Sequence, residues 1–488
     1  MPDDLLYANG INAATGRPLL PGLAPGMVAK VAAGETLTAA ELADLDDKRR
    51  RIAGGEDSQT HGVIAGIAAN DLGQAGWGIL TAAEDAPALP AIREALAPLL
   101  ALRRQQAGDR YREYDGELAC FPGDSKNGWL GRAGGEPGPV DPARTPYYLL
   151  ILANPEKIPF RFQYQLDVQY AVGRLWFDGP DALDRYANYA QTVVAAETGQ
   201  LSGRPWSLPR KAAFFGVRNA GDTATGLSAK YLVKPLAEYL AADQAAWRVT
   251  TCMDEQADKA SLGRLLGGDD TPALLFTASH GVGFPSGHEL QRRHQGALLC
   301  GDWPGPERWR EAIPETFYFS ADDVADGARL LGTIAFHFAC YGAGTPRLDE
   351  FTHRAGLAAQ AQIAPCDFLA GLPQRLLGHP RGGALAVIGH VDRAWGCSFI
   401  WDGISSQLTA FKSTLKCLAE GQRVGCATEY FNERYAELST LLSAQIEDIK
   451  FGAEPDERAL AGLWTANNDA RSYIVIGDPA VKLPLAAV

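Results

Sequence analysis

The middle of the chain alternates short apolar runs with segments of helical periodicity. The runs are apolar on adjacent as well as alternate positions and end at turn-forming residues, a pattern typical of strands buried on both faces of a sheet. They cover residues 147–153, 168–177, 212–217, 247–252, 273–278, 330–339 and 383–389. Residues 181–197 and 226–242 carry apolar side chains at helical spacing, and Pro235 predicts a kink in the second of these helices. The alternation predicts β-α-β crossovers and a parallel sheet covered by helices on both sides.

The first 140 residues follow no such alternation. One amphipathic helix is predicted over residues 91–104, and Trp77 is expected in the core. Residues 123–146 are dense in turn formers and show no periodicity, which predicts a long loop or a linker. We therefore expect a boundary in that segment.

Composition, charge and cysteine pattern exclude several classes of protein. With 488 residues, 46% of them hydrophobic and 21% charged, the chain is typical of a globular protein of several domains. A net charge of -13 argues against binding to nucleic acid or to an anionic membrane surface. The N-terminus lacks a basic segment followed by an apolar run, and no stretch reaches about 18 uninterrupted apolar residues, so we expect a cytoplasmic protein without a membrane span. The eight cysteines form no C-x-x-C pair, which predicts free thiols, no metal site and no cofactor.

Two strand endings carry residues that could do chemistry. In an open parallel sheet the active site lies at the carboxyl ends of the strands. Residues 273–278 run directly into His280 and Gly281, and residues 330–339 run into Cys340. If these strands are neighbours, an imidazole and a thiol emerge at one edge as a base and a nucleophile. The backbone N–H groups of Gly281 and Cys340 are then candidates for an oxyanion hole.

Each residue by itself has a simpler interpretation. A single cysteine after a strand is ordinarily a buried thiol, and a single histidine is ordinarily a core residue that is satisfied by hydrogen bonds. The ordered pair at two strand ends, each followed by glycine within two residues, favours the catalytic interpretation. His288 and His294 lie in the segment between the two motifs and are interpreted as solvated loop residues, because no further ligands stand at metal-binding spacing.

An apolar strand ending in His-Gly, followed downstream by an apolar strand ending in Ala-Cys, resembles the signature of the cysteine peptidase clan that contains caspases, legumain, clostripain and the gingipains. Within that clan the chain looks most like the gingipain-like peptidases, over about residues 147–484. The segments that carry the resemblance are AVGRLWFDGPDALDRYANYAQTVVAAE, LLFTASHG, IAFHFACYGAG, GALAVIGHVDRAW and IVIGDPAVKLP.

The resemblance implies a caspase-like (caspase-hemoglobinase) three-layer α/β sandwich with a mostly parallel sheet, two α/β subdomains and an N-terminal extension. Residues 1–145 would be an N-terminal region whose role the resemblance does not assign. Residues 146–205, with parts of that region, would form a non-catalytic α/β subdomain, and residues 206–488 the catalytic domain.

By the same resemblance the protein would be a cysteine endopeptidase that acts through Cys340, His280 and a thioester acyl-enzyme, and the cytoplasmic location expected from the N-terminal sequence would make it an intracellular one. The absence of a recognisable secretory signal favours regulated cleavage, as a zymogen or in signalling or defence, over bulk digestion. We expect a protein or peptide substrate and an activating protein partner. The alternative is a caspase-like scaffold or pseudo-peptidase that binds a partner protein.

In gingipain-like enzymes the primary specificity pocket includes the segment that maps here onto residues 390–395, where Trp395 matches best. A carboxylate in the pocket would select Arg or Lys before the cleaved bond by charge-assisted hydrogen bonding. Asp392 is one candidate for that carboxylate, and Asp222, just past the strand 212–217, is the other. Asp222 is equally a candidate for orienting His280, and the sequence leaves both roles open.

Overall fold

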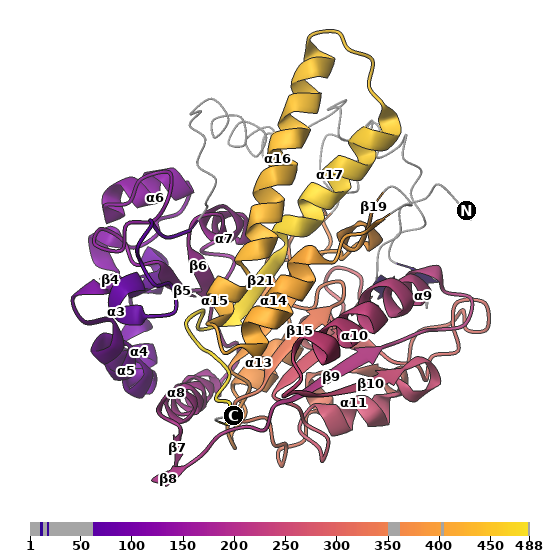
Figure 1. The fold of residues 1–488 in the computed structure, drawn as a ribbon, viewed down its shortest axis with the longest axis horizontal. Helices are drawn as coiled ribbons and strands as arrows, with labels where there is room; N and C mark the ends of the chain where they lie inside the picture. The colour runs from indigo at the N-terminus through magenta and orange to yellow at the C-terminus, as the bar shows by residue number, and fades with distance from the viewer. Residues whose placement is uncertain (1–9, 13–16, 19–61, 350–361, 402–404, 487–488) are drawn as a thin grey trace.

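The computed structural model describes residues 10–12, 17–18, 62–349, 362–401 and 405–486. Ten strands build its central sheet, with helices on both sides (Figure 1). The strands are β3 (Trp77–Thr81), β4 (Tyr111–Tyr114), β5 (Tyr148–Leu152), β6 (Ala171–Arg174), β9 (Lys211–Gly216), β10 (Arg248–Met253), β11 (Leu274–Ala278), β15 (Ile334–Phe338), β18 (Ala386–His390) and β21 (Tyr473–Gly477). This architecture confirms the predicted three-layer α/β fold with a mostly parallel sheet.

The sheet consists of two parallel halves that meet in opposite directions. Its order is β10-β9-β11-β15-β18-β21-β6-β5-β3-β4. The first five strands are parallel to one another, the last five are parallel to one another, and the single antiparallel contact joins β18 to β21. The carboxyl ends of β9, β11, β15 and β18 therefore lie at one edge of the sheet, and those of β6, β5 and β3 lie at the other.

The predicted domain boundaries at residues 145 and 205 stay predictions. The strand pairing shows which segments of the chain build each half of the sheet. Strands β3 and β4 come from the N-terminal region and pair in the same half as β5 and β6. The C-terminal strand β21 also belongs to this half, because it runs parallel to β6. The first half is thus assembled from both ends of the chain.

Helices fill the connections. They include α3 (Leu72–Ala75), α4 (Leu89–Ala95), α7 (Phe160–Asp167), α12 (Gln291–His294), α13 (Gly371–Leu377), α14 (Thr409–Ala419) and α15 (Val424–Ala427). Helix α8 (Ala182–Thr198) confirms the first predicted helix, whereas the second is divided into α9 (Thr223–Ser228), a π-helical turn (Ala229–Val233) and α10 (Lys234–Asp243). Pro235 is the second residue of α10, which continues directly from the π-helical turn. The interruption therefore precedes the proline, in the π turn.

The expected loop over residues 123–146 is wrong in its first part, which forms helix α6 (Lys126–Ala133). Ser125 caps its first turn by accepting a hydrogen bond from the backbone N–H of Gly128, and Gly134 ends it in the left-handed conformation at φ 85°. Trp129 and Leu130 on this helix are buried. Capping and burial thus stabilise a helix in a segment whose many turn-forming residues predict a loop.

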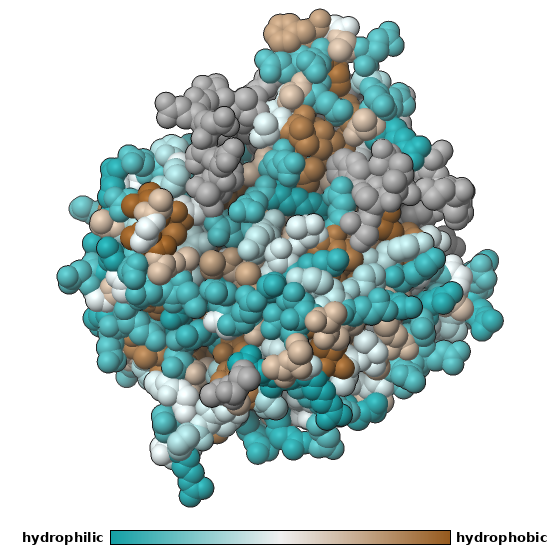
Figure 2. Space-filling view, in the orientation of Figure 1, coloured by the Kyte–Doolittle hydropathy of each residue, from teal (hydrophilic) through white to brown (hydrophobic). Residues whose placement is uncertain are grey.

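A helical hairpin extends away from the sheet (Figure 1). It consists of α16 (Glu429–Lys450) and α17 (Glu457–Arg471), which pack against each other. Figure 2 shows a largely hydrophilic surface with hydrophobic patches along this hairpin. None of the helices in the described ranges is both long enough and apolar enough to span a bilayer.

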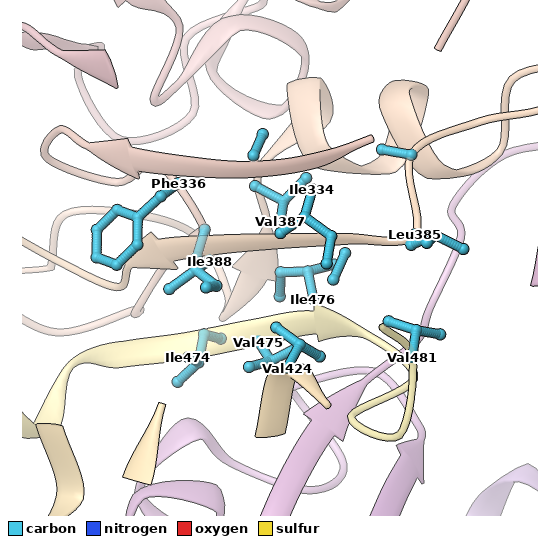
Figure 3. Packing of buried hydrophobic residues seen from close by; sticks show 14 of the residues in the cluster. Ile334, Phe336, Leu385, Val387, Ile388, Val424, Ile474, Val475, Ile476 and Val481 are labelled. Atoms are coloured by element: carbon cyan, nitrogen blue, oxygen red, sulfur yellow. The ribbon is translucent and has the colours of Figure 1, made fainter. Parts of the chain in front are cut away.

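The core lies where the two halves of the sheet meet. All five residues of β11, β15, β18 and β21 are buried, which is why their sequences are apolar on both faces. Figure 3 shows Ile334, Val387 and Ile476 from three neighbouring strands packed together. Strand β10, at the sheet edge, is only partly buried and correspondingly carries Thr250 and Thr251. Strands β15 and β18, next to the candidate site, are therefore buried along their whole length.

Candidate active site

Strands β11 and β15 bring His280 and Cys340 to the same level of the sheet. The two strands are parallel neighbours, and Ala278 pairs with Phe338 at their carboxyl ends. The backbone N–H of Ser279 extends this pairing by donating to the carbonyl of Phe338 at 3.2 Å. His280 and Cys340 each stand two residues beyond the last pair. The expectation that these strands are neighbours is therefore confirmed.

Gly281 lies in direct backbone contact with Cys340. A Cβ atom placed on Gly281 would lie only 1.8 Å from the carbonyl oxygen of Cys340 and 3.1 Å from its nitrogen. Since both neighbours are backbone atoms, only glycine fits here. Gly281 begins β12 (Gly281–Gly283), which pairs with β13 (Leu298–Leu299) in a second, smaller sheet. The two N–H groups predicted to form an oxyanion hole thus belong to residues in contact, and their role stays a prediction.

Asp222 lies against His280, a position that fits the proposed role of orienting the imidazole. It follows β9 and caps α9 by accepting the N–H of Thr225 at 3.0 Å. Its Oδ2 atom also lies 2.9 Å from His280 Nε2, and both side chains are buried. Burial raises the pKa of Asp222, but the charge of His280 and hydrogen bonds from His280 and Thr225 outweigh it and lower the pKa to about 2. The carboxylate is therefore ionised at neutral pH and faces the imidazole.

Nδ1, the other ring nitrogen of His280, is buried and has no hydrogen-bond partner within the described residues. The ring packs edge-on against Trp303, with 6.4 Å between the ring centroids and 76° between the planes. With Nε2 engaged by Asp222, Nδ1 is the nitrogen left for proton transfer. Sequence analysis did not single out Trp303, because it lies in an irregular segment with no periodic signal.

Cys340 is fully buried, at 0% exposure. Burial raises the pKa of its thiol well above the ordinary value, while a contact with the carbonyl of Ala394, 3.8 Å from Sγ, and the charge of Arg393 oppose that rise. The thiol is therefore neutral in this closed arrangement. The carbonyl of Ala394 is the polar group in contact with this thiol.

Backbone strain is concentrated beside Cys340. Tyr341 and Asp392 are non-glycine residues in the left-handed region, at φ 59° and 66°. The two residues are joined, because the N–H of Tyr341 donates to the carbonyl of Asp392 at 2.7 Å. Such conformations cost roughly 1–3 kcal/mol each and cluster at functional sites. The hydrogen bond between these two strained residues lies next to Cys340 in the chain, which supports a functional site there.

The predicted pocket residues Asp392 and Trp395 are buried, and each already has a polar partner within the protein. Asp392 is 5% exposed and lies 3.4 Å from the guanidinium of its neighbour Arg393. Arg393 in turn forms two hydrogen bonds of 2.6 Å with Asp349. Trp395 is buried in the apolar cluster between α16 and α17, and its backbone N–H donates to Asp469 at 2.9 Å. The ion pair with Asp349 was not predicted, because 44 residues separate its members.

His294 corrects one minor expectation. It is 1% exposed and contacts the hydroxyl of Tyr318 and the carboxylate of Asp322, each at 2.9 Å. It is therefore a buried residue with two polar partners and not a solvated one. Across the described ranges, no three or more His, Cys, Asp or Glu side chains gather in a way that could hold a metal ion.

A surface cavity of about 640 Å³ lies elsewhere and includes neither His280 nor Cys340. Its lining contains Arg185, Arg293 and Arg375 together with acidic neighbours. Each of these guanidinium groups is paired with a carboxylate. The cavity is thus charge-compensated and separate from the candidate dyad.

Comparison with known proteins gave matches among solved structures. The Arg-specific cysteine proteinase gingipain R (RGPB) has 13% sequence identity and a TM-score of 0.47, over 84% of this chain and 78% of that one. A structure described as a protease has 11% identity and a TM-score of 0.47 over the same shares. The complex of Porphyromonas gingivalis RgpB pro- and mature domains has 12% identity and a TM-score of 0.40, over 84% and 79%. The chain is similar to gingipain cysteine proteinases.

No protein-family model and no curated protein matches the sequence. At 11–13% identity the likeness to the solved structures does not extend to individual site residues. The chemistry of the site therefore depends on the geometry of this chain.

Proposed function

We propose that this protein is a cysteine endopeptidase in which Cys340 is the nucleophile, His280 its general base and Asp222 the group that positions the imidazole. The observation that carries the proposal is the buried Asp222–His280 contact of 2.9 Å beside the strand pair that delivers Cys340. A carboxylate on one ring nitrogen fixes the tautomer and leaves the other nitrogen as a proton acceptor.

The reaction begins with transfer of the Cys340 thiol proton to Nδ1 of His280. The thiolate attacks the scissile carbonyl, and the negative oxygen is stabilised by the N–H groups of Gly281 and Cys340. His280 then returns the proton to the departing amine, which leaves a thioester. Water, deprotonated by His280, hydrolyses the thioester, releases the carboxylate product and restores the thiol.

The closed site supports a regulated setting, such as a zymogen or a signalling or defence enzyme with an activating protein partner. The thiol is buried and neutral, so an unactivated molecule would react slowly. An intracellular location, predicted from the sequence, is part of the same proposal.

Preference for Arg or Lys before the cleaved bond is a further part of the proposal. It now centres on Asp392, because Asp222 is engaged by His280. A basic substrate side chain would have to share Asp392 with Arg393. The burial of His280 and Cys340 also favours a second candidate function, a scaffold that binds a partner protein without cleaving it.

The test is cleavage of a fluorogenic peptide library that varies the residue before the scissile bond, with and without prior limited trypsin treatment. Wild type is compared with Cys340→Ala, His280→Ala and a matched control, Cys120→Ala, which removes another buried thiol, beside the end of β3 in the other half of the molecule. We expect activity in wild type and the control only. Cleavage that survives Cys340→Ala would refute the dyad, and inactivity of wild type in both conditions would favour the scaffold.

A further inference from the structure

Among the described residues, the hairpin of α16 and α17 packs against other elements at its base, and its far end projects away from the sheet (Figure 1). Leu438, Leu442, Leu460 and Leu463 form part of its buried apolar seam. Near the base, α16 packs against α14. The connection between the two helices lies at the end farthest from the sheet (Figure 1). The hairpin is thus a rigid projection whose far end contributes little to the core.

That far end exposes large apolar side chains. Phe451, directly after α16, is 84% exposed, and Leu441 is 50% exposed, the two highest values among large hydrophobic residues in the described ranges. Ile446 and Ile449, between them in the chain, are partly buried and pack against the apolar seam. We call these four residues the tip patch. Figure 2 shows hydrophobic surface over this part of the hairpin. Large apolar side chains left exposed on a projecting hairpin make this end a candidate interaction site.

Acidic side chains surround the tip patch. Between residues 447 and 458 the chain carries five carboxylates and two basic groups, a local net charge of -3. The carboxylates are Glu447, Asp448, Glu454, Asp456 and Glu457, and the basic groups are Lys450 and Arg458. An apolar centre with an acidic rim complements an apolar centre with a basic rim. A second copy of this chain would instead be repelled, because its tip is also acidic and its total charge is -13.

We propose that the tip patch is the docking site of a protein partner that presents a basic amphipathic surface, such as a helix with leucine-like residues on one face and lysines beside them. A helix of this kind can lay its apolar face on the tip patch while its cations meet the acidic rim.

The base of the hairpin connects this docking site to the proposed active site, and this consequence depends on the proposed function. Asp469 of α17 accepts hydrogen bonds from the backbone of Trp395 and from Ser398, and Arg434 of α16 donates to the carbonyls of Cys397 and Ser398 at 3.0 and 2.7 Å. The same segment places the carbonyl of Ala394 against the Cys340 thiol. A partner that shifts the hairpin would therefore shift the segment that closes the site.

The test measures binding directly, without peptidase activity. A fluorescent synthetic amphipathic helix of Leu and Lys is titrated with the full chain, beside an acidic twin of Leu and Glu. The chains compared are wild type, the double variant Leu441→Ser/Phe451→Ser, the charge variant Glu447→Lys/Glu454→Lys and the control Leu183→Ser. Leu183 is a matched control because it is 46% exposed on α8, outside the hairpin.

We expect the basic helix to bind wild type and the control equally, and both hairpin variants at least tenfold more weakly, with unchanged thermal unfolding. Failure of the basic helix to bind, equal binding of the acidic twin, or equal weakening by Leu183→Ser would overturn the proposal. Preferential binding of wild type to neutral lipid vesicles would also overturn it in favour of a membrane surface. None of these outcomes depends on cleavage, so they are independent of whether the peptidase assay succeeds.

Discussion

Replacing Asp222 by Asn removes the charge opposite His280 while keeping the size of the side chain and an oxygen that can cap α9. In the folded protein the pKa of Asp222 is lowered from 3.8 to about 2, which corresponds to roughly 2 kcal/mol of stabilisation. Because the folded pKa lies below the unfolded one, this stabilisation is fully present above about pH 4 and is lost as pH falls through 2. We expect Asp222→Asn to lose roughly 2 kcal/mol at pH 6 and progressively less below pH 4.

The measurement is urea unfolding of wild type and variant at several pH values between 6 and 2.5. Asp258→Asn is the matched control, because Asp258 caps α11 (Lys259–Leu265) by accepting the N–H of Ser261 at 2.7 Å. Asn caps helices about as well as Asp, so the control should lose less than about 1 kcal/mol. A loss in Asp222→Asn that does not change with pH, or that equals the control, would refute the assigned role of the charge.

The same substitution has a kinetic consequence. The Asn amide can donate an N–H to Nε2 of His280, which moves the ring proton to Nδ1, the nitrogen that must accept the thiol proton. In serine peptidase triads the equivalent change lowers kcat by about 10⁴. We expect a loss of at least about 100-fold in kcat, and activity close to that of wild type would show that Asp222 does not set the tautomer.

Other residues give equally direct predictions. Gly281→Ala should destabilise the protein by about 1–3 kcal/mol or more in urea, because the new Cβ meets the Cys340 carbonyl, and wild-type stability would contradict the contact. Iodoacetamide at neutral pH should leave Cys340 unmodified in peptide mapping until urea unfolds the chain, whereas rapid native labelling would disprove a closed site. Asp478→Ala should cost about 3–5 kcal/mol, because Asp478 pairs with Arg103 of α5 (Ala97–Ala107) at 2.7 Å and both are fully buried; a loss under about 1 kcal/mol would contradict this.

The sequence predicts the central strands of the sheet well, because a strand buried on both faces has few polar residues and is visible as an uninterrupted apolar run. Strands β5, β11, β15 and β18 were all predicted from such runs, each within a few residues of its observed bounds. Helix α16 was not predicted although Phe431, Tyr435, Leu438 and Leu442 recur at helical spacing, so the signal was present. The antiparallel insertion of β21 could not be predicted, because it depends on pairing between residues almost 90 positions apart.

For the candidate site, chain position was informative where a residue lies shortly after the end of a strand. His280 and Cys340 each stand two residues past a strand and Asp222 six residues past one, and the parallel sheet brings His280 and Asp222 into contact. Trp395 was expected in a pocket but is buried under the hairpin, because its surroundings are set by a helix pair formed later in the chain. Local sequence specifies what a strand end carries, whereas tertiary packing decides which loop closes over it.

The closed site and activation by a partner are also consistent in magnitude. The segment beside Cys340 is held to the hairpin by hydrogen bonds from Arg434 and to Asp469, each with one charged partner. Hydrogen bonds to charged groups contribute about 1.5–3 kcal/mol each, so releasing three of them costs on the order of 5 kcal/mol or more. Only the difference between a partner's affinities for the open and the closed state shifts such an equilibrium, so a partner that releases these bonds must prefer the open state by about 5 kcal/mol to populate the two states equally. A partner that moves the hairpin and the segment together, with these bonds intact, needs a smaller preference.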